Sequence, residues 1–291
     1  RATEATTKYF LTQAAASAMV LFSSAINAWH TGTWDIMQLT NQPASIMLTM
    51  ALAMKLGLAP LHFWLPEVLQ GSSLKTALII TTWQKLAPMT LLFLTNNSTH
   101  PPTLMLMGLL STLLGGWGGL NQTQTRKIMA FSSIANLGWM ATVLTLAPNI
   151  MILNLVIYVL MTLSMFMTLI ISSSKTIKDL TTMWTISPTM SALTMLLLMS
   201  MGGLPPLTGF MPKWLILQEL ALHNLLMIAT VLVLSALLSL FFYMRMSYTT
   251  ALTMPPTTTQ TKMKWRFKPK NATTMLIALA LSLFLLPMTP T

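Results

Sequence analysis

Cysteine is absent from the 291 residues of this chain. Without thiolates, these residues cannot hold a cysteine-ligated iron–sulfur cluster, a cysteine-type zinc site or a disulfide. The sequence also lacks a glycine-rich phosphate-binding loop between a strand and a helix, so we expect no nucleotide site. Any redox chemistry associated with this chain is therefore expected to take place in other chains.

Charged residues are scarce, and acidic ones are the scarcest. Only 7% of the residues are charged, with 5 Asp and Glu against 16 Lys and Arg, while 54% are hydrophobic. The mean hydropathy of +0.68 is too high for a water-soluble domain of this length, which would need a solvated surface. The composition predicts a polytopic membrane protein.

Long apolar runs recur along the whole chain, and most have the roughly 18 to 25 residues that a helix needs to cross a bilayer. They cover residues 6–28, 45–64, 74–95, 102–120, 128–147, 150–172, 187–222, 225–248 and 273–288. None shows the alternation of a barrel strand, so each is expected to be helical. The sequence therefore predicts an all-α polytopic membrane protein with about nine transmembrane helices.

Basic residues gather on one side of this predicted topology. Threading the spans alternately across the bilayer places on one face Arg1, Lys8, Lys75, Arg126, Lys127, Lys175, Lys178, Arg245, Lys262, Lys264, Arg266, Lys268 and Lys270. The opposite loops contain His30, Asp35, His100 and His223 but neither Lys nor Arg. This asymmetry is typical of the positive-inside rule and predicts that the basic face is cytoplasmic, or faces the matrix in a mitochondrion. The net charge of +11 is thus not expected to indicate a nucleic-acid partner.

Two spans contain residues that interrupt helices. In the second span, Lys55 is followed by Gly57 and Pro60, and the proline predicts a kink or an unwound turn. The seventh run of about 36 residues would be roughly 54 Å long as one helix, which is too long for a straight span. It contains Gly and Pro residues at 202–206 and then Lys213, so we predict two half-helices joined by unwound backbone.

Two interrupted helices that each carry a lysine are typical of transporters built from inverted repeats. The threading directs the two interrupted spans in opposite senses, as an inverted repeat requires. We predict that residues 1–95 hold the last three helices of a first repeat, residues 102–248 a complete five-helix repeat, and residues 249–291 a basic loop with a C-terminal helix. By this interpretation the first repeat is truncated, and two more helices are expected before Arg1.

Three lysines, Lys55, Lys85 and Lys213, lie deep inside apolar runs. A lysine at the bilayer centre costs at least ~2.5 to 3.5 kcal/mol, so its presence favours a functional role. Burial lets a lysine load and release a proton near neutral pH, whereas arginine would keep its proton, which favours a proton relay. The alternatives are snorkelling or static pairing with carbonyls at helix ends, and the half-helix end beside Lys213 could provide such a pairing.

Two further residues are weaker candidates. His62 stands beside the first interruption, where it could conduct protons or simply bond to freed backbone carbonyls. Glu67 is expected in a loop near the basic face, where it could act with Lys75 at the mouth of a proton path or form a plain interfacial salt bridge.

A series of short motifs resembles a known family. The motifs are Arg1 with Glu4, Lys8-Tyr9-Phe10-Leu11 and Gln13; Ala53-Met54-Lys55-Leu56-Gly57; Pro60-Leu61-His62-Phe63-Trp64; Pro66-Glu67-Val68; Trp83-Gln84-Lys85-Leu86-Ala87-Pro88; Gly118-Gly119-Leu120-Asn121-Gln122-Thr123-Gln124 with Arg126-Lys127; Gly202 to Pro206 with Gly209-Phe210 and Pro212-Lys213-Trp214; and Lys262-Met263-Lys264-Trp265. In this order they cover essentially the whole chain. They resemble the subunit 2 family of mitochondrial NADH:ubiquinone oxidoreductase, respiratory complex I.

The resemblance implies an antiporter-like, proton-translocating subunit of the membrane arm, in which Lys55, Lys85 and Lys213 correspond to the lysines of a midplane hydrophilic axis. The family pairs the first lysine with a glutamate on a preceding helix, which this sequence does not contain. Many relatives are expected to have a histidine where this chain has Asn136, which cannot titrate, so a relay step at that position is in doubt.

The resemblance also implies the surroundings of the chain. We expect the mitochondrial inner membrane with the basic loops in the matrix, and as partners other membrane-arm subunits, phospholipids such as cardiolipin, and protons. The chain itself is expected to bind no cofactor, while the whole complex would use NADH, FMN, iron–sulfur clusters and ubiquinone.

Two other functions remain open at this point. One is a free-standing cation/proton antiporter, which copurifying redox subunits would exclude. The other is a passive structural subunit of the membrane arm, which would have no need to retain three intramembrane lysines.

Overall fold

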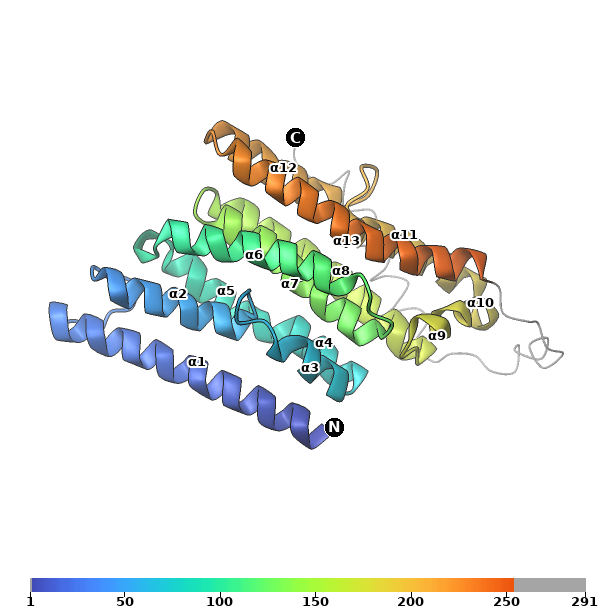
Figure 1. The fold of residues 1–291 in the computed structure, drawn as a ribbon, viewed down its shortest axis with the longest axis horizontal. Coiled ribbons are helices and arrows are strands. Elements are labelled where there is room, and N and C mark those ends of the chain that lie inside the picture. The colour runs from blue at the N-terminus through green and yellow to red at the C-terminus, as the bar shows by residue number, and fades with distance from the viewer. Residues whose placement is uncertain (1, 254–291) are drawn as a thin grey trace.

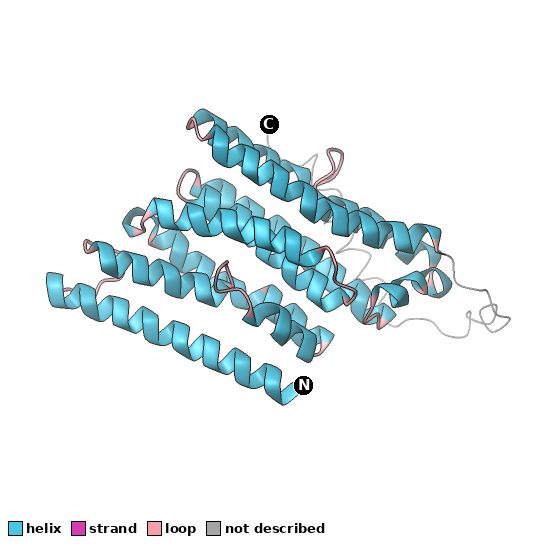
Figure 2. Ribbon diagram, in the orientation of Figure 1, coloured by secondary structure: helices cyan, strands magenta, loops and turns pink. Residues whose placement is uncertain are grey.

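The computed structural model describes residues 2–253, which form a bundle of helices (Figures 1 and 2). The elements are α1 (Ala2–Thr31), α2 (Gln42–Leu56), α3 (Trp64–Gly71), α4 (Leu74–Thr81), α5 (Trp83–Leu94), the 3₁₀ turn η1 (Asn96–Ser98), α6 (Pro101–Gly119), α7 (Thr125–Leu144), α8 (Pro148–Ser172), α9 (Ile177–Thr181), α10 (Met183–Ile186), α11 (Pro188–Gly202), α12 (Phe210–Leu222) and α13 (Leu226–Leu252). No strand occurs among these residues; one isolated β-bridge joins Gln124 to Thr176.

The predicted all-α membrane architecture is confirmed over this part of the chain. Five stretches are long and apolar enough to cross a membrane: α1, α4 with α5, α7, α8 and α13. The predicted span at 273–288 and the basic residues from Lys262 to Lys270 lie outside the described residues, so the count of nine helices stays a prediction. After the first interruption the chain is helical again in α3, which ends at Gly71, beyond residue 64 where the second apolar run was predicted to end.

Both predicted interruptions are present, and each begins at a glycine in the left-handed conformation. α2 is capped at its C-terminal end by Gly57, with φ 78°, and α11 by Gly203, with φ 84°. A side chain is disfavoured at such φ values, whereas glycine adopts them readily. The N–H of Gly57 donates to the Ala53 carbonyl at 2.8 Å, as expected where a helix ends on a left-handed residue.

A third interruption, which the sequence analysis did not predict, divides the span at 74–95 at Thr82. The N–H of Lys85 donates to the Thr82 carbonyl at 3.3 Å, three residues back, instead of to Thr81 four residues back. Pro88 lies inside α5 and has no N–H for the regular helical bond. A proline at this position favours distortion of the preceding turn, where Lys85 lies.

The loops that carry basic residues meet at one end of the bundle, which we call the basic end. There the Lys8 ammonium on α1 pairs with Glu67 on α3 at 2.6 Å, and the Arg126 guanidinium on α7 donates to the Ser72 carbonyl after α3. On α13, Arg245 donates at 2.6 Å to the carbonyl of Leu120, which follows α6. In Figure 1 the N-terminal end of α1 and helices α9 and α10 lie at this end. Within residues 2–253, these contacts agree with the predicted segregation of charge; Arg1 and the basic residues from Lys262 to Lys270 lie outside the described residues.

Two apolar clusters fill the interior. The basic-end cluster includes Trp64, Ile134, Phe166, Leu198 and Phe242, and the opposite-end cluster includes Leu52, Met89, Leu137, Ile216 and Leu232. Helices α7 and α8 contribute residues to both clusters.

Candidate functional site

Polar side chains mark the boundary between the two apolar clusters. On α7, the change from one cluster to the other falls between Ile134 and Leu137, at Asn136. On α4 and α5 it falls between Ala77 and Met89, around Lys85. Across α11 and α12, the change between the clusters falls between Met201 and Ile216, around Lys213. Across α2 and α3, it falls between Leu58 and Trp64, at His62. The sequence thus folds into two apolar halves separated by a polar layer.

Lys85 is buried in this layer, with 4% of its surface exposed. Its Nζ atom makes no hydrogen bond to any of the described residues. Nζ lies over the ring of Tyr158 on α8, 5.6 Å from the ring centroid, where the face of the ring attracts its charge. The Tyr158 hydroxyl donates to the Thr81 carbonyl at 3.1 Å.

Lys213 is half-buried in the first turn of α12 and reaches back across the second interruption. Its Nζ donates to the carbonyl of Gly202, the last residue of α11, at 3.0 Å. An ammonium is favoured there because the carbonyls at the end of a helix carry partial negative charge. The pairing with a half-helix end that the sequence left open as an alternative is therefore present.

Lys55 is half-buried in the last turn of α2, just before the first interruption. There the Met54 carbonyl accepts a hydrogen bond from Nε1 of Trp64, at 3.1 Å. In both interrupted helices, then, a side chain of the second half bonds to a carbonyl at the end of the first half. Because α2 packs against α5, the helices that carry Lys55 and Lys85 are neighbours.

A narrow cavity of about 10 Å³ extends this layer between α8 and α12. Its polar lining comprises Asn136, Asn154, Tyr158 and Lys213. This volume is close to the minimum that holds one water molecule, and the lining offers several hydrogen-bonding groups. Lys213 also lines a mainly apolar pocket of about 780 Å³. Its ammonium therefore has access to the inner cavity and to the outer pocket.

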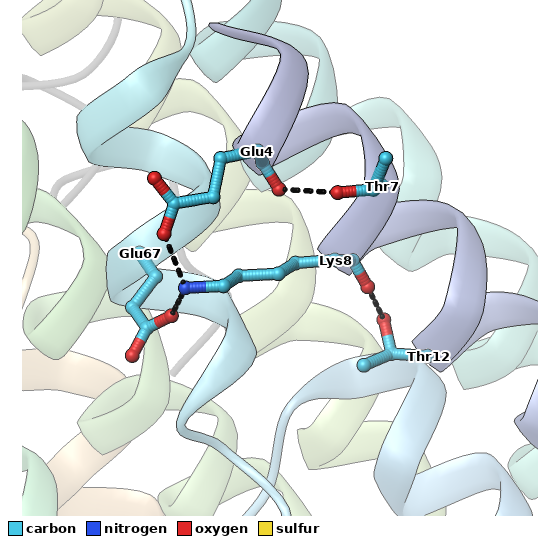
Figure 3. Close-up of polar contacts among 5 residues, drawn as sticks. All are labelled: Glu4, Thr7, Lys8, Thr12 and Glu67. Carbon is cyan, nitrogen blue, oxygen red and sulfur yellow. Dashed lines mark hydrogen bonds and ion pairs between the residues drawn. The ribbon is translucent and has the colours of Figure 1, made fainter. Parts of the chain in front are cut away.

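Glu67 lies toward the basic end from His62, which stands at the boundary between the two apolar clusters. Glu67 is part of α3, so the prediction of a loop was wrong. The Glu67 carboxylate pairs with Lys8 rather than with Lys75, because α1 brings Lys8 against α3 (Figure 3). The Lys8 ammonium also pairs with Glu4, at 2.8 Å. His62 is buried, and its Nδ1 has no hydrogen-bond partner in the described structure. The two predicted residues share a pocket of about 490 Å³.

No group of three or more His, Asp and Glu side chains that could hold a metal occurs in residues 2–253. Within residues 2–253, none of the three lysines, of which Lys85 is buried and Lys55 and Lys213 are half-buried, forms an ion pair with a carboxylate. An ammonium without a fixed counter-charge in an apolar layer can exchange its proton with a neighbouring water or polar group more readily than one in a static salt bridge.

Comparison with known proteins decides the family. Residues 1–239 match the family model described as NADH:quinone oxidoreductase/Mrp antiporter, TM, and residues 240–291 match that described as NADH dehydrogenase subunit 2 C-terminus. NADH-ubiquinone oxidoreductase chain 2 of Xenopus laevis is 57% identical over 291 residues, which cover 100% of this chain and 84% of the relative. This chain belongs to the NADH-ubiquinone oxidoreductase chain 2 family. The corresponding protein of Varanus melinus is 56% identical over 292 residues, covering 100% of this chain and 85% of the relative.

Solved structures agree with membership of the chain 2 family. Respiratory complex I from Thermus thermophilus with bound aureothin contains a chain that superposes with a TM-score of 0.81 at 28% identity, covering 98% of this chain and 68% of the other. The Mrp complex from Dietzia sp. DQ12-45-1b gives a TM-score of 0.78 at 20% identity, covering 89% and 53%. At that identity the second match shows a common fold alone.

The family resemblance inferred from the motifs is confirmed, whereas the roles of Lys55, Lys85, Lys213, His62 and Glu67 stay predictions. Sequence reasoning missed Tyr158 and the interruption at Thr82. A tyrosine in an apolar helix gave no signal, and only Pro88 could have indicated the interruption.

Proposed function

We propose that this member of the chain 2 family is a proton-translocating subunit of the membrane arm of NADH:ubiquinone oxidoreductase, and that Lys55, Lys85 and Lys213 carry the protons. The observation that carries the proposal is the position of the lysines in or beside a polar layer between two apolar clusters, without a carboxylate partner in residues 2–253. A scaffold would gain nothing from such positions, because each buried ammonium disfavours insertion into the membrane.

The proposed path has two segments. Lys55 and Lys85 lie on the packed helices α2 and α5, and the Tyr158 side chain leads from Lys85 to the narrow cavity at Lys213. Protons reach this layer from the basic end by way of Glu67 and His62, whose side chains line one pocket. Asn136 lines the narrow cavity and contributes hydrogen bonds to water there, without titrating itself.

The finer architecture belongs to the same proposal. Residues 1–95 form the last three helices of a first repeat, residues 102–248 a second, inverted five-helix repeat, and residues 249–291 a basic loop with a ninth membrane helix. The glycines that end α2 and α11 support this division, since each half-helix ends in the same conformation. The basic end faces the matrix across the mitochondrial inner membrane, and the charge segregation supports this orientation.

Membership of the chain 2 family supports the enzymatic classification that we propose. The chain is part of a proton-translocating NADH:ubiquinone reductase whose NADH, FMN, iron–sulfur clusters and ubiquinone are bound by other subunits. Its partners are those membrane-arm subunits, phospholipids such as cardiolipin, and the protons themselves. The names of the Xenopus and Varanus relatives and the complex I structure support this assignment over a free-standing antiporter.

The test replaces each of the three lysines by methionine in the assembled oxidoreductase. Methionine keeps most of the volume and removes the titratable charge, so the amount of assembled complex should be preserved while NADH-driven proton transport falls sharply. Lys75→Met is the matched control, because Lys75 is exposed at the start of α4, in the same predicted span as Lys85. Normal assembly together with normal proton transport in all three variants would refute the relay.

A further inference from the structure

Tyr158 fills a hydrogen-bonding position that the interruption at Thr82 creates. In an unbroken helix the Thr81 carbonyl would accept the N–H of Lys85, four residues later. Here that N–H donates to Thr82 instead, and the Tyr158 hydroxyl donates to Thr81 at 3.1 Å. A side chain from α8, 77 positions away in sequence, thus replaces a backbone bond at the turn that carries Lys85.

The ring of the same tyrosine compensates the charge of Lys85. The Lys85 ammonium lies 5.6 Å from the ring centroid and makes no hydrogen bond to residues 2–253. The face of an aromatic ring attracts a cation, and the attraction is strongest where both groups are removed from water. Tyr158 is fully buried, at 2% exposure, so this contact is well desolvated.

Tyr158 also borders the narrow cavity that Asn136, Asn154 and Lys213 line. One side chain therefore contacts Lys85 and faces the cavity that reaches the next lysine. We infer that Tyr158 is a positioning residue for proton transfer: its hydroxyl, bonded to Thr81, fixes the ring, and the ring holds the Lys85 ammonium beside the cavity toward Lys213. This inference rests on the proposed function, because it assigns Tyr158 a part in the transfer between those two lysines.

The experiment compares Tyr158→Leu with Tyr158→Phe in the assembled oxidoreductase, reconstituted into liposomes. The amount of complex, the rate of NADH oxidation and the protons moved per NADH are measured for each variant. Tyr158→Leu removes the ring and should lower proton transport per assembled complex by more than about threefold and up to about thirtyfold, the range spanned by cation–π contacts from exposed to desolvated. Tyr158→Phe keeps the ring and loses only its anchor, so it should stay within about threefold of the unmodified complex.

Phe166→Leu is the matched control for packing. Phe166 is fully buried on the same helix, belongs to the basic-end cluster and is also an aromatic residue replaced by leucine. Its variant should lose some assembled complex but keep normal transport in the complex that remains. A purely structural role for Tyr158 would make Tyr158→Leu behave in the same way, and that result would overturn the inference.

Lys85→Met, measured in parallel, separates failure of this inference from failure of the proposed function. Normal transport in Lys85→Met would refute the relay at that position and the role of Tyr158 with it. Loss of transport in Lys85→Met with normal transport in Tyr158→Leu would leave the relay standing and overturn the inference about Tyr158. Equal losses in Tyr158→Phe and Tyr158→Leu would overturn the role of the ring.

Discussion

Replacing Gly203 with alanine perturbs the Lys213 ammonium without touching its charge. A Cβ atom on residue 203 would lie 2.9 Å from Nζ and 3.0 Å from Cδ of Lys213. These contacts are too close, so the flexible end of the lysine has to move. We expect this shift to weaken the hydrogen bond from Nζ to the Gly202 carbonyl, which measures 3.0 Å.

Two contributions determine the size of the effect. Residue 203 has φ 84°, and the left-handed conformation costs an alanine about 1 to 2 kcal/mol relative to glycine. If the Lys213 ammonium loses its hydrogen bond and finds no new partner, the loss adds about 1.5 to 3 kcal/mol to the destabilisation. We therefore expect moderate destabilisation, together with a misplaced ammonium at the mouth of the narrow cavity.

Gly57→Ala is the matched control for this substitution. Gly57 has φ 78°, so alanine meets the same conformational cost there, but a Cβ would lie at an ordinary contact distance of 3.5 Å from Leu65 and Trp64. Both variants should lower the melting temperature of the assembled complex, and only Gly203→Ala should lower the protons moved per NADH oxidised. The reasoning is refuted if the two variants reduce proton transport per assembled complex equally, or if Gly203→Ala leaves it unchanged.

Two further predictions concern packing and pH. Gly138→Ala should destabilise the contact between α6 and α7 by about 1 to 3 kcal/mol, because the new Cβ would lie 2.2 Å from Oγ of Ser111. The destabilisation should lower the yield of assembled complex, and an unchanged yield would contradict the prediction. Burial raises the pKa of the Asp179 carboxyl, but the backbone N–H groups of Thr176 and Lys175 donate to it and lower its pKa below the ordinary 3.8. Because the folded pKa is depressed, this stabilisation is present above about pH 4 and is lost as the pH falls through the folded value. Hydrogen exchange of the Thr176 amide, corrected for its intrinsic pH dependence, should become faster only in that acidic range. If exchange in the Asp179→Asn variant becomes faster by the same factor over the same pH range, the Asp179 carboxylate is excluded as the cause.

The two long interruptions could be predicted because their causes are local. A left-handed glycine at position 57 or 203 and the prolines that follow disfavour a continuous helix whatever packs around them. The segregation of basic residues was predictable for a similar reason, because span length fixes which loops share a side of the bundle.

The interruption at Thr82 was not predictable in the same way. Pro88 weakens the helix locally, but the bond that satisfies the freed Thr81 carbonyl comes from Tyr158 on α8. The pairing of Glu67 with Lys8 likewise depends on the packing of α1 against α3. Both features arise from tertiary contacts between distant segments, which hydrophobic periodicity does not specify.

The most direct test of the proposed relay is the number of protons moved per NADH oxidised by assembled complex carrying Lys55→Met. Lys55 lies in the last turn of α2, beside the first interruption and on a helix that packs against α5. The relay predicts a normal amount of complex with a sharply lowered proton yield or sharply lowered coupled turnover. The relay would be contradicted if the Lys55→Met complex kept the unmodified proton yield and turnover and so could not be distinguished from the Lys75→Met control.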